Sequence, residues 1–147
     1  MKKNICAFWF VCVFMACEQK PLEFEKLEQF SNIDTIKKDG KTILFKTDSY
    51  IVNNYRENLQ SEKTVDSFAY KNKAIDMALY EGYSIIIYKS SGKTNLENLK
   101  NNPKDFDNYT FDNDQIYTYT WGRGKWSGKF KFNGREMTRG EEMIRED

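Results

Sequence analysis

The chain contains no histidine, and this absence limits the chemistry open to it. A Ser–His–Asp triad and a histidine-based zinc site both need an imidazole. A glycine-rich phosphate loop and a Gly-x-Ser-x-Gly elbow are also missing from the sequence. We therefore predict no catalytic residue of the usual kind, no metal ion and no cofactor.

A strong charge of one sign is missing too. The chain has 23 basic and 22 acidic side chains, so it is close to neutral. A protein that binds the phosphates of nucleic acid normally concentrates lysine and arginine. Proline is scarce and aromatic side chains make up 16% of the residues, which is typical of a folded domain. We predict no nucleic acid among its partners.

Carboxylates are the remaining candidates for chemistry. The stretch DFDNYTFDND holds Asp105, Asp107, Asp112 and Asp114, but it lacks the glycine and glutamate of an EF-hand, so we interpret it as a solvated loop. The run Ser90-Ser91-Gly92-Lys93 matches a bare Ser-x-x-Lys pattern without its companion motifs, which favours a polar turn. A carboxylate pair for glycoside hydrolysis needs a separation that the sequence does not give. A hydrolytic enzyme that acts on an envelope glycan or another substrate therefore stays the alternative function.

The longest apolar run is short and stands near the start of the chain. It covers residues 5–16, follows Lys2 and Lys3, and contains Cys6 and Cys12. As a helix it spans about 18 Å, while a bilayer core is roughly 30 Å thick. A basic start followed by a short apolar segment is typical of an export signal, which we predict for residues 1–16.

The residues Phe14-Met15-Ala16-Cys17 resemble the lipobox of bacterial lipoproteins, with Phe14 where leucine is usual. The resemblance implies that the Cys17 thiol receives a diacylglyceryl group and that the chain is cut before it. The mature chain would then have one cysteine and no intramolecular disulfide. The expected location is the bacterial cell envelope, with the lipid in a membrane. Glu18 replaces the aspartate of the enteric retention signal, which favours the outer membrane.

The rest of the sequence predicts a short tether over residues 17–31 and one α+β domain over residues 32–147. An Asp39-Gly40 hairpin turn joins strands at residues 33–37 and 42–47, and residues 50–52 extend the second strand or form a third. The elements predicted after it are a helix over 62–81, a strand over 83–88, a short helix over 95–102, and strands over 115–121 and 125–132. We expect a two-layer fold with a mostly antiparallel sheet and one long helix packed on one face.

The last two predicted strands form an aromatic hairpin, for which two interpretations are open. In the first, its rings form the core face under the long helix, while Lys129 and Lys131 alternate to the solvated side. In the second, exposed rings form a stacking platform for a sugar or peptide. The ligand-binding residues would then be Tyr117, Tyr119, Trp121, Arg123 and Trp126.

Together these patterns favour a membrane-anchored envelope lipoprotein without enzymatic activity. Its expected role is binding, as an inhibitor or another binding module, with a protein partner or an envelope glycan as the ligand. It is expected to contact the membrane through the lipid on Cys17.

Metabolic labelling tests the predicted anchor. The full chain expressed in a bacterial host should incorporate radiolabelled palmitate, and Cys17→Ala should abolish the label because it removes the thiol to which the lipobox resemblance assigns the lipid. An unlabelled wild-type protein, or label that persists in Cys17→Ala, would defeat the assignment.

Overall fold

A computed structural model describes residues 20–101, 113–133 and 136–139. The predicted signal, Cys17 and most of the acidic stretch lie outside these residues. Two strands, β5 (Gln115–Gly122) and β6 (Lys125–Asn133), form the predicted aromatic hairpin. The other elements are β1 (Glu23–Lys26), β2 (Asn32–Lys38), β3 (Lys41–Asn53), α1 (Leu59–Asn72), β4 (Gly82–Lys89), α2 (Leu96–Asn101) and β7 (Glu136–Arg139), with 3₁₀ turns at Glu28–Phe30 and Met77–Leu79.

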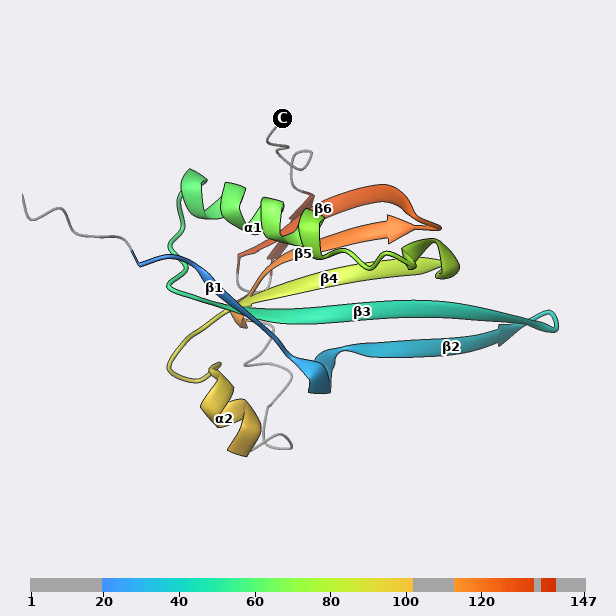
Figure 1. Ribbon diagram of the computed structural model, residues 1–147, viewed down its shortest axis with the longest axis horizontal. Helices are drawn as coiled ribbons and strands as arrows, with labels where there is room; N and C mark the ends of the chain where they lie inside the picture. Colours follow the sequence, from blue (N-terminus) through green and yellow to red (C-terminus); the bar gives the residue numbers. More distant parts are fainter. Residues whose placement is uncertain (1–19, 102–112, 134–135, 140–147) are drawn as a thin grey trace, which may run out of the picture.

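The described strands form one mixed sheet in the order β1-β3-β4-β5-β6-β7, with β2 on β3 (Figure 1). β3 and β4 run parallel, and every other pair is antiparallel. α1 follows β3 and lies across one face of the sheet, because a parallel pair needs a crossover connection. The predicted α+β class is confirmed, and the sheet, which was expected to be mostly antiparallel, is mixed because β3 and β4 run parallel.

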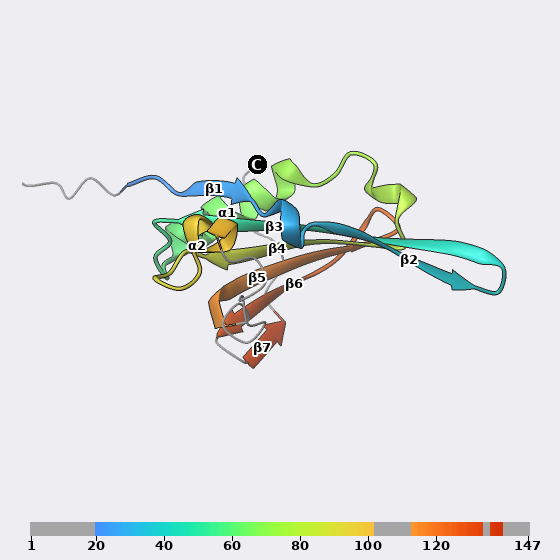
Figure 2. The same ribbon diagram turned by 90° about the horizontal axis from the view of Figure 1, so that it is seen from below.

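The main core lies between α1 and the sheet. Val65 and Ala69 of the helix belong to one cluster with buried and half-buried side chains from five strands, β1, β3, β4, β5 and β6. A smaller core lies on the other face, where Ile51 and Tyr88 alternate with the main-core residues of their strands. There they pack with Leu99 of α2. Figure 2 shows the sheet edge-on and the strands β5 to β7 curling away from α1.

The β2–β3 hairpin forms as predicted. Asp39 and Gly40 both have positive φ, as the expected type I′ turn requires. β3 continues without a break through residues 50–52, so these residues extend the second strand. The hairpin extends past Gly82, where β4 begins, and projects as a two-stranded arm (Figure 1).

The tether predicted for residues 17–31 is too long. β1 pairs with residues 50–53 of β3, on the same edge that β2 occupies further along. Leu27, directly after β1, is completely buried, and its amide donates to the Ser49 carbonyl at 2.8 Å. The folded domain therefore begins at β1, because this short strand pairs with the edge of β3 and the next residue, Leu27, is buried in the smaller core.

The single long helix predicted over residues 62–81 is wrong at its C-terminal end. α1 begins after Asn58, whose side chain accepts the Ser61 amide at 2.8 Å, and it ends at Asn72. The Asn72 side chain donates to the Phe68 carbonyl, and Lys73 leaves the helical region at ψ 140°. Ile75 and Leu79, the expected end of the apolar stripe, are 104% and 73% exposed. The two residues continue the helical spacing of the sequence, but neither side chain packs against the core.

Two alanine substitutions distinguish this short helix from the long one. Val65→Ala should lower the free energy of unfolding by about 2 kcal/mol, because it removes buried methyl groups and leaves a cavity. Ile75→Ala should change it by less than about 0.5 kcal/mol, as expected for an exposed side chain. Urea unfolding followed by tryptophan fluorescence measures both. Similar losses of unfolding free energy in the two variants would contradict the short helix and support the predicted helix over residues 62–81.

Candidate functional site

The aromatic hairpin is the predicted binding site, and the structure places its first strand in the core. Tyr117, Tyr119 and Trp121 are 1%, 0% and 3% exposed, under α1. Trp126 is half-buried, with its ring edge-on to Trp121 at 5.3 Å between centroids. The exposed stacking platform is therefore wrong for these rings, and the core interpretation describes them.

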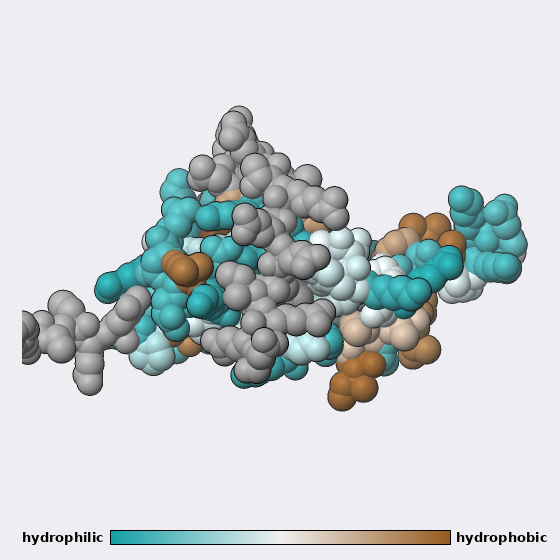
Figure 3. Space-filling model, turned by 90° about the horizontal axis from the view of Figure 1, so that it is seen from above, coloured by the Kyte–Doolittle hydropathy of each residue, from teal (hydrophilic) through white to brown (hydrophobic). Residues whose placement is uncertain are grey.

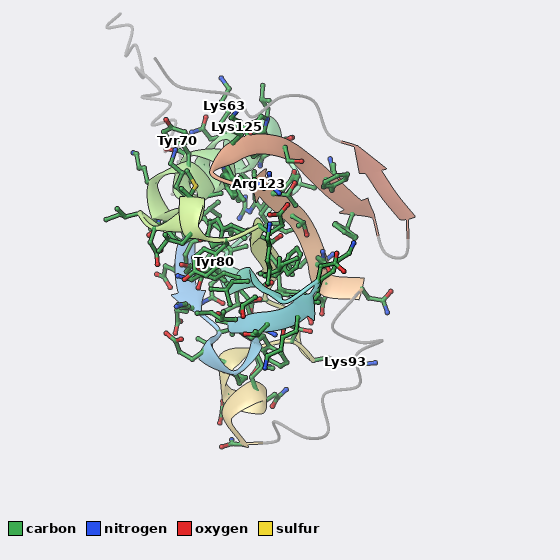
Figure 4. The ribbon with its side chains drawn as sticks, turned by 90° about the vertical axis from the view of Figure 1, so that its right-hand side faces the viewer. Lys63, Tyr70, Tyr80, Lys93, Arg123 and Lys125 are labelled. Atoms are coloured by element: carbon green, nitrogen blue, oxygen red, sulfur yellow. The ribbon has the colours of Figure 1, made fainter. Side chains whose placement is uncertain are left out.

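Arg123 is exposed, but it lies apart from any stacking surface. It lies at the β5–β6 turn beside Lys125 (Figure 4), and its Nε donates to Glu81 at 2.8 Å. Glu81 precedes β4, so this ion pair joins two neighbouring ends of the sheet. The predicted ligand-binding set of Tyr117, Tyr119, Trp121, Arg123 and Trp126 is thus divided between core and turn.

A β-bulge in β6 reverses part of the predicted alternation. Thr120 pairs with Gly128, while Trp121 pairs with Trp126, so Ser127 is an extra residue in the ladder. Beyond it, Lys129 pairs with Tyr119 and shares the helix-side face. The prediction that Trp126 faces away from Lys129 and Lys131 is therefore wrong, because one inserted residue changes the phase of a period-two pattern.

Lys129 is buried, contrary to the prediction that it is solvated. Its side chain is 3% exposed, and its Nζ lies 2.6 Å from Glu62 Oε1 and 2.8 Å from Asp66 Oδ1. Both acids belong to α1, and Asp66 is fully buried. The Tyr119 hydroxyl donates to the same Asp66 oxygen at 2.6 Å. The Nζ also lies 4.6 Å from the centroid of the Tyr117 ring. Helix and sheet are therefore joined by a charged cluster inside the core.

A second carboxylate, Asp48 of β3, is held in a similar way. It is 6% exposed and accepts the Tyr83 hydroxyl at 2.9 Å. Lys26 lies 3.2 Å from it, while Lys46 is a looser partner at 4.0 Å. Lys46 also approaches Asp76 at 3.8 Å. The Lys26–Asp48 ion pair thus joins β1 to β3, in addition to the main-chain pairing of the two strands.

The tyrosines of both clusters are held as hydrogen-bond donors. Burial, together with the Asp66 charge and hydrogen bond, raises the pKa of Tyr119 well above its usual value. Burial and the neighbouring Asp48 raise the pKa of Tyr83 beyond its ordinary range. A neutral phenol can donate a proton to a carboxylate in a hydrogen bond, whereas a tyrosinate would repel it. These groups stabilise the fold and do not supply a nucleophile.

The remaining sequence candidates are polar turn residues where the structure describes them. Ser91 Oγ accepts the Thr94 amide at 2.9 Å and donates to Asp114 at 2.7 Å. This agrees with the polar-turn interpretation of Ser90-Ser91-Gly92-Lys93. Asp105, Asp107 and Asp112 lie outside the described residues, and no acidic or thiol cluster that could hold a metal occurs within them. Among the described buried side chains, only Thr94 Oγ1 lacks a hydrogen-bond partner.

A pocket of about 160 Å³ lies where β5 begins and β6 ends. Its lining combines aromatic, amide and charged side chains: Tyr55, Glu57, Lys89, Asn113, Gln115, Ile116, Tyr117, Lys131 and Phe132. Glu57 is its single carboxylate and lies 3.5 Å from Lys131. The Tyr55 and Tyr117 hydroxyls are 3.3 Å apart. Such a lining suits hydrogen bonding to a small polar ligand, and it lacks the carboxylate pair of a glycosidase.

The arm end of the molecule exposes large apolar side chains that the sequence reasoning did not select. Ile33 and Ile36 of β2 are 54% and 51% exposed, and Phe45 of β3 is 36% exposed. Ile75 and Leu79, in the segment that leads to β4, are more exposed still. Figure 3 views the molecule along the sheet and shows hydrophobic surface on both sides of the arm. The signal in the sequence is the odd spacing of Ile33 and Ile36, which puts one isoleucine on each face of a strand.

Comparisons with known protein families, with curated proteins and with solved structures find no match for this chain. Within the described residues, no helix is long and apolar enough to cross a membrane.

The two lysines of β6 provide a matched test of the buried cluster. Lys129→Met should lower the free energy of unfolding by about 3 kcal/mol, because it leaves the buried Asp66 without its counter-ion. Lys131→Met should cost less than about 1 kcal/mol, because its partner Glu57 is 76% exposed. Chemical denaturation measures the difference. Equal losses would show that Lys129 contributes no more than a surface lysine.

Proposed function

We propose that this protein is a lipid-anchored lipoprotein of the bacterial envelope, held in the outer membrane, that binds a protein partner without catalysing a reaction. An inhibitor or immunity factor is the kind of role that fits. The partner would dock on the apolar surface beside the arm, defined here by Ile33, Ile75 and Leu79.

The anchor is supported by the first seventeen residues and by the early start of the fold. The lipobox resemblance assigns the lipid to Cys17, and β1 begins at Glu23. The short stretch between them, when fully extended, reaches about 20 Å. A tether of this length keeps the sheet close to the bilayer surface. A partner in the same membrane, or bound to its surface, would therefore be within reach.

The observation that carries the binding role is the exposed apolar surface. Ile75 and Leu79 are 104% and 73% exposed, and Ile33 is 54% exposed. On the same side of the arm, Lys46 pairs with Ile33 in the ladder and contacts Asp76, which follows Ile75. Large apolar patches rimmed by polar groups commonly mark interaction surfaces. The charged rim here gives a partner directional contacts around an apolar centre.

Hydrolysis is less well supported than binding. Asp48 and Asp66 are buried and held by lysines, so they offer no pair of carboxylates to a substrate. The pocket has one carboxylate in its lining. An envelope glycan could use the tyrosine and amide groups of that pocket, but the pocket is small and its single carboxylate, Glu57, is paired with Lys131. A protein partner on the larger exposed surface is therefore the preferred ligand.

Photo-crosslinking in intact cells tests the binding surface. A photoreactive residue at Ile75 should yield a protein adduct, whereas one at Leu59 should not. Leu59 is a matched control because it is 61% exposed and apolar but is the first residue of α1, whereas Ile75 follows the C-terminal end of this helix. Adding Leu79→Asp should abolish the Ile75 adduct, because a carboxylate would be desolvated on docking. Adducts of equal yield at both sites, or none at either, would contradict the proposed surface.

A further inference from the structure

The outer edge of β2 is open for pairing. Within the described residues β2 pairs with β3 alone, and all seven of its residues are exposed. The β2–β3 ladder runs from Asn32 to Lys38 without a register shift. No proline or bulge interrupts this strand, so its outward N–H and C=O groups form a continuous row. Such an edge can accept another strand by main-chain hydrogen bonds.

The side chains of β2 are complementary to a second β2 in the antiparallel direction. A two-fold axis at Ile36 puts the two Ile36 side chains opposite each other and each Asp34 opposite the second copy's Lys38. The neighbouring registers are worse. An axis at Asp34 or at Lys37 places like charges opposite each other, and an axis at Thr35 places Asp34 opposite isoleucine. Opposite charges across a ladder stabilise the pair, and like charges destabilise it.

The Ile36 register also extends an apolar row across the joined sheets. In the β2–β3 ladder Ile36 pairs with Ile43, so both lie on the face opposite α1. Phe45 lies on the same face, next along β3 from Ile43. Pairing two copies at Ile36 therefore aligns four isoleucines across four strands, in the order Ile43, Ile36, the second copy's Ile36, and the second copy's Ile43. Each Ile36 side chain, 51% exposed in one copy, gains an apolar neighbour.

We propose that two copies of this chain associate through their β2 edges, antiparallel and centred on Ile36. Figure 1 shows the arm projecting from one end of a single copy. In the antiparallel pair the two arms lie side by side, with the bodies of the two copies at opposite ends. The two-fold axis is perpendicular to the sheet, so the two β1 strands have the same position along this axis. Both tethers can therefore enter one membrane plane. This last point rests on the proposed lipid anchor, whereas the pairing itself does not.

The interface is one strand wide in each copy, which places it in the weak class of protein contacts. Residues 34–38 form the ladder, because beyond them the second copy's turn begins. Anchoring in one membrane confines both copies to a thin layer and raises their effective concentration. Association is therefore expected on the membrane and only weakly in dilute detergent solution. The α1-side surface of Ile75 and Leu79 stays open in the pair.

Cysteine crosslinking in membranes that contain the full chain tests the register. Opposed residues of an antiparallel pair have Cα atoms about 4.5–5.5 Å apart, within reach of a disulfide. Ile36→Cys should therefore form a disulfide dimer on mild oxidation. Thr35→Cys is the matched control, because its diagonal distance to the second copy's Thr35 is about 7–8 Å, too far for a disulfide. Equal dimer yields at both positions, or none at Ile36, would overturn the proposal.

A charge swap tests the same pairing independently. In the Ile36→Cys background, Asp34→Lys should lower the dimer yield several-fold, because it puts lysine opposite Lys38. Combining Asp34→Lys with Lys38→Asp should restore it. These side chains are exposed, so folding should be unchanged in circular dichroism. A double variant that stays as weak as Asp34→Lys would overturn the register.

Two controls keep the anchor and the pairing distinct. The chain without an added cysteine should give no dimer, because the predicted signal carries away Cys6 and Cys12 and the lipid blocks Cys17. Palmitate labelling of the same sample reports the anchor directly. Label without Ile36-specific dimers refutes the pairing alone, and specific dimers without label refute the anchor alone.

Discussion

The ammonium group of Lys129 lies inside the core, between two carboxylates of α1, and the packing of the helix on the sheet depends on it. Asp66 is fully buried, so its charge is tolerable only with a close counter-ion and a hydrogen-bond donor. Lys129 supplies the first at 2.8 Å and Tyr119 supplies the second at 2.6 Å. A buried ion pair adds little net stability compared with apolar side chains, but its geometry is demanding. We infer that it fixes the position of α1 over β5 and β6.

That contact requires the bulge at Ser127, and the bulge explains why the hairpin differs from its predicted form. The alternation of rings and lysines in β6 predicts one apolar face and one solvated face. One extra residue in the ladder puts Trp126 and Lys129 on the same side. A bulge has no reliable sequence signal, and the Gly128 beside it is equally compatible with a regular strand. The burial of Lys129 follows from its partner Asp66, which is 63 residues distant in the sequence.

Local patterns predicted the parts of the fold that local chemistry determines. Asp39-Gly40 requires a tight turn, and the apolar run of β4 indicates a central strand; both are confirmed. The end of α1 and the edge strand β1 depend on tertiary contacts. Ile75 continues the helical spacing but finds nothing to pack against, while Glu23–Lys26 looks like a charged tether until it pairs with β3. The candidate site was missed for a related reason, since exposure cannot be read from residue type.

The molecule thus divides into a closed core under α1 and an open arm, and we propose that binding belongs to the arm. A double-mutant cycle between Asp66→Asn and Lys129→Met tests the central contact most directly. We expect a coupling free energy of about 2–3 kcal/mol in chemical denaturation, because each group is costly to bury without the other. Losses that add to within about 0.5 kcal/mol would show that the two residues act independently. The helix would then be positioned by its apolar contacts alone.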